Sequence, residues 1–375
     1  MIATTRPELS VRETPLFVAV ELSQREWKLA LTAGFQVRPW LRTIAAGDFA
    51  AWDGAVAAAR MRFQLAASVP IVSCYEAGRD GFWIHRALTQ RGVDNRVVDS
   101  ASIAVSRRAK SAKTDRLDAE KLVAMLVRVW HGERHVWREV RVPTAAVEAA
   151  RQVSRERTAL TQEQTALRNQ MRSWLVTWGA PLPAQCPEGW WTAVRDWAGA
   201  ALPAELQARL ARATARLTLL QEQLAVLAGV QRAAVAAAAA TSAVRRLVTL
   251  KGVATTSASV LVDEGLVWRA FRNRRQIGGL LGFAPTPFAS GETQHEQGIS
   301  RAGNPRLQST MIQLAWSWVR WQPSSPITRW FQTQFGKGKR GRKIGIVAVA
   351  RKLLIALWRW ATAGVEPDGA IFKAA

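Results

Sequence analysis

The chain has 375 residues, with 52 Lys and Arg against 28 Asp and Glu, which gives a formal net charge of +24. This excess indicates a polyanionic partner and favours nucleic acid. The sequence has no run of about 18 apolar residues that could span a bilayer, and no charged-then-apolar start typical of a signal peptide. Of the two cysteines, Cys74 lies in an apparent buried strand, which favours reduced thiols over a disulfide with Cys186.

Strand and helix patterns alternate in the first third of the chain, after a polar start at 1–15 that we expect to be flexible. This alternation predicts an α/β layered domain over 16–135. The predicted strands are 17–21 and 26–31, which form a hairpin, and 69–76 and 95–99. The predicted helices are 48–67, 81–92 and 113–129.

A helical linker with a Trp-rich insert is predicted over 140–240. Helical periodicity from 147 to about 171 is broken at Gly179, and Pro203 opens a second helix. Apolar residues in that helix follow steps of four and three, from Leu206 to Leu227, as in a coiled-coil seam. This seam is consistent both with an internal hairpin against 147–178 and with a dimer contact, and the sequence favours neither.

The last part, 241–375, reads as a mainly α domain. Residues 246–264 resemble a helix-hairpin-helix, whose turn can present backbone N–H groups to phosphate, although an ordinary helical pair has the same pattern. A Gly/Pro-rich loop is predicted at 278–304 and a Trp-rich helix at 305–322. The basic run at 336–343 predicts a flexible segment that follows a phosphate backbone.

Four acidic residues occupy positions typical of a metal-dependent nuclease. Glu21 and Glu76 each end a predicted strand, and Asp115 and Asp118 lie three apart on a predicted helix, so that both can face one site. Carboxylates suit Mg²⁺ or Mn²⁺, the usual metals of phosphoryl transfer. Taken alone, however, the aspartate pair is more often a solvated helix face beside Arg116.

Basic side chains near these acidic residues and in the C-terminal part are candidates for nucleic-acid binding. The first group precedes the aspartate pair, where it could hold a scissile backbone. The full set is Arg107, Arg108, Lys110, Lys113, Arg272, Arg274, Arg275, Arg301, Lys337, Lys339, Arg340, Arg342 and Lys343.

Several of these segments resemble one family of enzymes. The first domain of insertion-sequence-110-type transposases resembles three segments: Tyr75-Glu76-Ala77-Gly78, Val97-Val98-Asp99 and the segment from Ala112 to Ala119. The second domain of these enzymes resembles Leu250-Lys251-Gly252-Val253, 277–285, Ser290-Gly291 and 298–304. The resemblance covers about 16–130 and 245–320. These transposases are bridge-RNA-guided recombinases with a RuvC-like DEDD domain.

The resemblance implies an N-terminal RuvC/RNase H-like fold, a helical coiled-coil arm and a mainly α C-terminal domain. It carries the DEDD tetrad onto Glu21, Glu76, Asp115 and Asp118 as ligands of Mg²⁺ or Mn²⁺, and the attacking serine onto Ser290. It further implies a bacterial, cytoplasmic, nucleoid-associated DNA transposase. The expected partners are element and target DNA, a guide RNA and further copies of the chain in a dimer or tetramer, with no membrane partner.

Two features depart from this pattern or leave it incomplete. The first tetrad position is normally Asp, and the extra methylene of Glu21 extends the carboxylate further from the backbone, where the strict geometry of Mg²⁺ requires an adjustment. No general base for Ser290 is evident, although His295 is five residues away. The serines that compete with Ser290 are Ser257, Ser259 and Ser300.

Two other functions are compatible with the same residues. A RuvC-like nuclease would use water as the nucleophile, and a binding protein would use none of the carboxylates. A zinc site at His131 and His135 is disfavoured because Gly132 lies between them. The sequence has no CxxC motif and no Walker loop, and none of its predicted strands is followed by a dinucleotide-binding glycine fingerprint.

Overall fold

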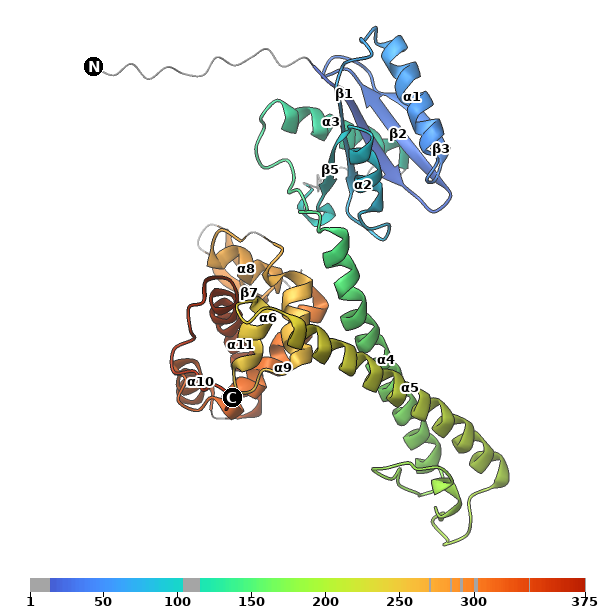
Figure 1. Cartoon of the computed structure of the whole chain (residues 1–375), viewed down its shortest axis with the longest axis vertical. Helices are drawn as coiled ribbons and strands as arrows, with labels where there is room; N and C mark the ends of the chain where they lie inside the picture. The colour runs from blue at the N-terminus through green and yellow to red at the C-terminus, as the bar shows by residue number, and fades with distance from the viewer. Residues whose placement is uncertain are drawn as a thin grey trace, which may run out of the picture. The chain divides into compact units, whose positions relative to one another are not determined.

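The computed structural model describes residues 14–103, 115–269, 271–283, 285–290, 293–299, 303–336 and 338–374, with the backbone alone at 101 and 285–298. The chain divides into two compact units, Met1–Pro143 and Thr144–Ala375 (Figure 1). The helices of the predicted linker group with the C-terminal part in the second unit.

The first unit is built on a mixed five-stranded sheet in the order β3-β2-β1-β4-β5. Strand β1 is antiparallel to β2 and β2 to β3, whereas β4 is parallel to β1 and β5 to β4. The strands are β1 (Leu16–Leu22), β2 (Glu26–Thr32), β3 (Trp40–Ala45), β4 (Ile71–Glu76) and β5 (Asp94–Val98).

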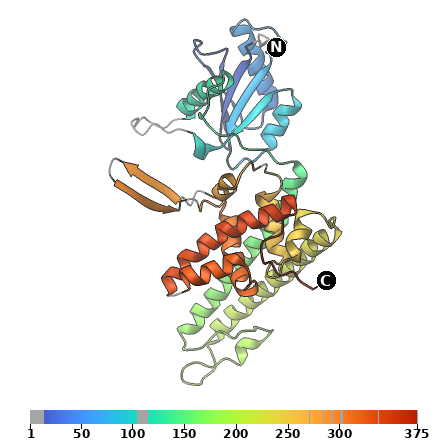
Figure 2. The same cartoon turned by 90° about the vertical axis from the view of Figure 1, so that its left-hand side faces the viewer.

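Helices cover both faces of this sheet (Figures 1 and 2). The helices α1 (Phe49–Arg62) and α2 (Trp83–Gln90) pack on one face, and α3 (Asp115–Trp130) packs on the other. The central strand β1 is therefore apolar on both sides, with Leu16 to Val20 all buried.

The alternating pattern predicted the sheet and its helices with one omission. The antiparallel pairing of β1 with β2 and the strand and helix positions from α1 to α3 are confirmed in the described residues. Strand β3 was missed because it lies at the sheet edge, where Ile44 is its only buried side chain, so its sequence lacks the alternation of a half-buried strand.

The second unit begins with two long helices, α4 (Ala145–Val176) and α5 (Ala204–Ala237), which run side by side (Figure 1). Leu167, Met171 and Leu175 of α4 share a buried core with Leu210 and Leu217 of α5. The internal hairpin accounts for this part of the predicted seam; supercoiling of the helices and contact with a second copy stay predictions. Between them, the 3-10 turn η2 (Trp190–Thr192) is held by Trp190 Nε1, which donates to Thr214 at 2.8 Å.

The remainder of the second unit is a helical core with one β-hairpin. Its helices pack around buried residues such as Leu247, Met311 and Leu353. They are α6 (Ala243–Thr249), α7 (Thr255–Leu261), the π-helix η3 (Val262–Leu266), α8 (Arg274–Leu280), α9 (Pro305–Trp321), α10 (Pro326–Phe335) and α11 (Lys339–Ala363). The antiparallel hairpin of β6 (Pro285–Ser290) and β7 (Thr293–Ile299) extends away from these helices (Figure 2).

Two sequence predictions for this unit were wrong in part. Residues 278–304 do not form a continuous loop, since they contain the end of α8 and the hairpin β6–β7. The basic run at 336–343 is not a flexible stretch in its described part, because 339–343 form the first turn of α11. A turn joins α6 and α7, as the sequence pattern predicted; within it Lys251 N donates to the Ile371 carbonyl oxygen and Val253 N to that of Leu250, and phosphate binding by this turn stays a prediction.

Within the described residues, no helix combines the length and apolar character needed to cross a membrane.

Candidate active site

Glu21 and Glu76 lie at equivalent positions on neighbouring parallel strands. The register between β1 and β4 ends at the pair Val20 and Tyr75, so each glutamate follows the last residue that its strand pairs in this ladder. Because side chains alternate along a strand, Glu21 is on the side of Phe17 and Ala19, and Glu76 on the side of Cys74. Both carboxylates therefore belong to the sheet face that α3 covers, and both residues are half-buried.

Helix α3 carries the two aspartates to the same face. Its buried residues, among them Ala119 and Leu122, pack against the sheet, and Asp115 and Asp118 each lie one turn before one of these two residues. The contact is close at Cys74, whose Sγ lies 4.0 Å from the Leu122 carbonyl oxygen. Burial raises the pKa of the Cys74 thiol well above its ordinary value, which makes this cysteine a packing residue rather than a nucleophile.

Lys28 belongs to this carboxylate face, and sequence reasoning missed it. It is the cross-strand partner of Glu21 in the β1–β2 ladder, and its Nζ lies 3.8 Å from Asp115 Oδ2. Asp118 has its own counter-charge, because Lys121 Nζ lies 3.7 Å from its Oδ1. The alternation of β2 was the available signal, since Lys28 and the buried Ala30 point to the same side.

The four carboxylates fit a hard divalent cation in chemistry but do not form a closed cluster. Oxygen donors of this kind are the ligands that Mg²⁺ and Mn²⁺ prefer. The side chain of Asp118 is 25% exposed and that of Asp115 60% exposed, so α3 holds one close to the sheet and the other nearer solvent. Among the described side chains, no three His, Cys, Asp or Glu groups lie close enough together to hold one ion.

The other predicted site residues are distributed over the second unit or lie outside the described part. Ser290 ends β6, where its backbone pairs with Thr293 across the hairpin. The exposed basic side chains include Arg272, Arg274 and Arg275 beside α8, and Lys339, Arg340, Arg342 and Lys343 on α11. Outside the described residues lie Arg107, Arg108, Lys110, Lys113, Ser300, Arg301 and Lys337.

The structure argues against two weaker candidates, the zinc site at the two histidines and a second serine nucleophile. His131 and His135 do not share a helix, because α3 ends at Trp130 and Gly132 has a φ of 88°. Ser259 is buried in α7, and so lacks the access that a nucleophile for DNA would need.

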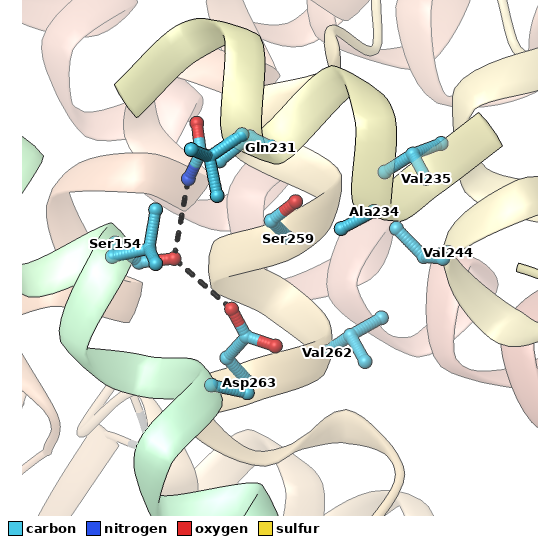
Figure 3. Close-up of a pocket in the computed structure, with 11 residues that line it drawn as sticks. Ser154, Gln231, Ala234, Val235, Val244, Ser259, Val262 and Asp263 are labelled. Carbon is cyan, nitrogen blue, oxygen red and sulfur yellow. Dashed lines mark hydrogen bonds between the residues drawn. The ribbon is translucent and has the colours of Figure 1, made fainter. Parts of the chain in front are cut away.

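A buried polar cluster in the second unit was missed by sequence reasoning. The Ser154 hydroxyl of α4 donates to Asp263 Oδ2 at 3.0 Å and accepts from Gln231 Nε2 of α5 at 3.4 Å (Figure 3). Asp263 lines a pocket of about 190 Å³ whose other walls include Val235 and Val262. Its neighbour Glu264 is 3% exposed. Two adjacent acidic residues within an otherwise apolar stretch were the signal in the sequence.

The two carboxylates of this cluster are tuned in opposite directions. Burial raises the pKa of Asp263 to about 6, against the hydrogen bond from Ser154, and the nearby negative charge of Glu264 adds to the rise. For Glu264, burial acts to raise the pKa, but hydrogen bonds from Arg155 and Asn304 outweigh it and hold the pKa below its ordinary value. Glu264 therefore stays ionised to lower pH than Asp263 does.

Comparison with known proteins identifies the class to which this architecture belongs. A family model for the IS110-type DEDD transposase domain, described as a transposase, matches residues 56–178. A second model, the transposase IS116/IS110/IS902 family, matches residues 244–328. The two parts of the chain are therefore those of a DEDD transposase.

Full-length relatives give the same assignment. A Sinorhizobium fredii protein named as transposase y4rJ is 39% identical over 396 residues, covering 100% of this chain and 99% of the relative. A Pseudomonas aeruginosa protein named as a family 20 transposase is 27% identical and covers 77% of this chain and 82% of its own length. The chain belongs to the IS110 family of transposases.

The raised pKa of Asp263 predicts a pH-dependent cost in stability. Because the folded-state pKa is above the unfolded value of 3.8, the favourable contribution of the neutral carboxyl is complete below about pH 4 and is lost as the pH rises through about 6. Asp263→Asn keeps a neutral group with an acceptor for Ser154. We expect it to raise the melting temperature at pH 8 by at least about 2 °C, and to leave it unchanged at pH 4.

Thermal melts of both proteins across this pH range test the prediction. Asp368→Asn, which changes an exposed carboxylate in the same unit, serves as the control. A melting temperature for Asp263→Asn that equals the wild-type value at pH 8 would contradict the assigned pKa.

Proposed function

We propose that this transposase cleaves and rejoins DNA through a covalent protein–DNA intermediate, with Glu21, Glu76, Asp115 and Asp118 as ligands of a divalent metal and Ser290 as the nucleophile. The observation that carries the proposal is the common sheet face: β1, β4 and α3 each bring carboxylates to the same side. The strand order β3-β2-β1-β4-β5, with β1 central, supports the RuvC-like fold that the family resemblance implies.

The metal ligands would come from three elements. Mg²⁺ or Mn²⁺, when bound, supplies positive charge that stabilises the phosphodiester during attack. Glu21 reaches the site through one methylene more than the usual Asp, and Lys28 lies across the ladder from it. A cation at Lys28 restrains the mutual repulsion of the carboxylates and gives Asp115 a fixed partner.

Attack by Ser290 forms a bond between its hydroxyl oxygen and the DNA phosphorus, and the hydroxyl proton is released. The bond from phosphorus to the leaving DNA oxygen breaks, and that oxygen takes up a proton. Because one phosphodiester replaces another, rejoining to a second DNA strand needs no external energy source. Ser290 is at the end of a strand that extends away from the helical core, which is a suitable position for reaching a duplex (Figure 2).

Nucleic-acid binding is assigned to exposed basic residues of the second unit. Lys339, Arg340, Arg342 and Lys343 occupy the first turn of α11, where positive charge opposes the helix dipole. A set of cations in this unfavourable place is better explained by phosphate binding than by helix stability. We assign the same role to Arg272, Arg274 and Arg275.

We further propose that a structured RNA determines which DNA sequences are joined. We also propose that the chain works as a dimer or tetramer in the bacterial cytoplasm.

The proposal predicts a serine-dependent adduct. The full chain, combined with its element's flanking DNA and transcript, should give a protein–DNA adduct on a denaturing gel with wild type and none with Ser290→Ala. Asp118→Ala should also abolish the adduct while changing DNA affinity by less than about twofold, because metal chemistry and backbone attraction are separable.

Glu120→Gln is the matched control for Asp118, because Glu120 lies on the same helix in a pair with Arg116 at 3.3 Å. Cleavage by both wild type and Ser290→Ala, with no adduct in either, would make water the nucleophile and favour a hydrolytic nuclease. Adduct formation by Asp118→Ala would remove the tetrad assignment.

The basic turn of α11 makes a separate prediction about affinity. Replacing Lys339, Arg340, Arg342 and Lys343 by Ala should weaken binding to all duplexes alike. The slope of log affinity against log salt concentration should become shallower by about 0.9 for each phosphate that the variant no longer neutralises. Salt titrations by fluorescence anisotropy provide this slope, with the double substitution Lys352→Ala and Arg359→Ala on the same helix as control. A slope unchanged from wild type would mean that this turn does not touch phosphate.

A further inference from the structure

The hairpin β6–β7 leaves and re-enters the helical core at one place. Asn304 N, which follows the hairpin, donates to the Leu280 carbonyl oxygen, which precedes it, at 3.0 Å. Gln308 Nε2 of α9 donates to the carbonyl oxygen of the fully buried Leu281 at 2.7 Å. The two ends of the hairpin are thus held together by hydrogen bonds to backbone groups within the core.

The two chain segments also approach each other more closely than side chains would allow. A Cβ atom on Gly303 would lie 2.2 Å from the carbonyl carbon of Leu281 and 2.4 Å from the backbone nitrogen of Gly282. These neighbours are backbone atoms, so they cannot rotate away as a flexible side chain could. Only glycine permits this approach.

Glu264 connects this junction to the rest of the unit. Its Oε2 accepts from Asn304 Nδ2 at 3.0 Å, and its Oε1 lies 3.1 Å from Arg155 Nε of α4 and 3.7 Å from Arg306 Nη1. Asn304 is also the N-cap of α9, since its Oδ1 accepts from the backbone of Arg306 and Leu307. One buried carboxylate therefore joins helix α4 to the cap of α9, which follows the hairpin in the chain.

A contribution to stability alone does not explain this arrangement well. Burying a carboxylate with guanidinium groups costs desolvation that the ion pairs roughly offset, so an apolar residue would stabilise the junction equally well. An apolar residue would not, however, fix the direction in which the chain leaves the junction. Charge-assisted hydrogen bonds from Arg155 and Asn304 fix the position of the segment that follows β7.

From these contacts we infer that Glu264 is a positioning residue for the Ser290 hairpin: its carboxylate fixes the junction from which β6–β7 extends and couples that junction to the arm through Arg155. The inference rests on the proposed function in taking Ser290 as the nucleophile. Loss of the carboxylate leaves the hairpin attached but less constrained, so that the serine meets the phosphodiester in the reactive geometry less often.

Glu264→Gln and Gly303→Ala test this in the full chain with the element DNA and transcript. The first removes the charge and keeps the shape, and the second forces the two backbone segments apart without changing any charge. At saturating DNA, each should slow adduct formation by about ten- to a hundredfold, with DNA affinity changed by less than about twofold. Hydrogen exchange measured by mass spectrometry should become faster over 280–283 and 303–308 in both variants.

Val349→Ala is the control for stability, because Val349 is fully buried in α11 and its apolar side chain makes none of the junction's hydrogen bonds. It should lower the melting temperature at least as much as Glu264→Gln and leave the adduct rate within about twofold of wild type. Wild-type adduct rates for Glu264→Gln and Gly303→Ala, or equal slowing by Val349→Ala, would overturn the inference. If wild type forms no Ser290-dependent adduct, the proposed function fails instead, and unchanged exchange at the junction would then overturn the positioning role.

Discussion

The packing of α3 on the face of β1 and β4 is the contact on which the candidate active site depends. Apolar residues from Ala119 to Val127 bury one side of the helix against the sheet, and this burial fixes where its first turn lies. The alternation of β1 and β4 directs Glu21 and Glu76 to the same side. Four carboxylates thus share one face because two strands and one helix are held by a common core, with Lys28 adding positive charge among them.

The second unit holds a β-hairpin that extends from a helical core. The described contacts at its base are polar and backbone-based: Gly303 lets two segments touch, Asn304 N donates to the Leu280 carbonyl oxygen of the other segment, and Glu264 links Asn304 to Arg155 of α4. Asp263, one residue earlier, joins α4 and α5 through Ser154. Helix α4 and the cap of α9 consequently meet at two adjacent residues of η3.

Local patterns predicted most of the first unit and little of this junction. Apolar runs ending at Glu21 and Glu76, and the periodicity of α3, identified the strands, the helix and their carboxylates, because in a layered sheet burial follows directly from alternation. Strand β3 was missed because edge strands are half-exposed, and the hairpin β6–β7 was missed because Gly and Pro residues at 278–304 favoured a loop. Lys28, Glu264 and Asn304 acquire their roles from contacts across many residues of sequence, which composition and spacing do not encode. The assignment of metal binding and of Ser290 came from family resemblance and stays a prediction.

The most direct test of the carboxylate site is Mn²⁺ binding to the full chain, measured from the EPR signal of free Mn²⁺. We expect the wild-type chain to bind Mn²⁺ in competition with Mg²⁺, and Glu76→Gln and Asp118→Asn each to weaken that binding by at least about tenfold, while Glu120→Gln leaves it unchanged. Equal Mn²⁺ affinity in wild type and both site variants would contradict the account, because it would mean that the shared face of β1, β4 and α3 does not hold the metal.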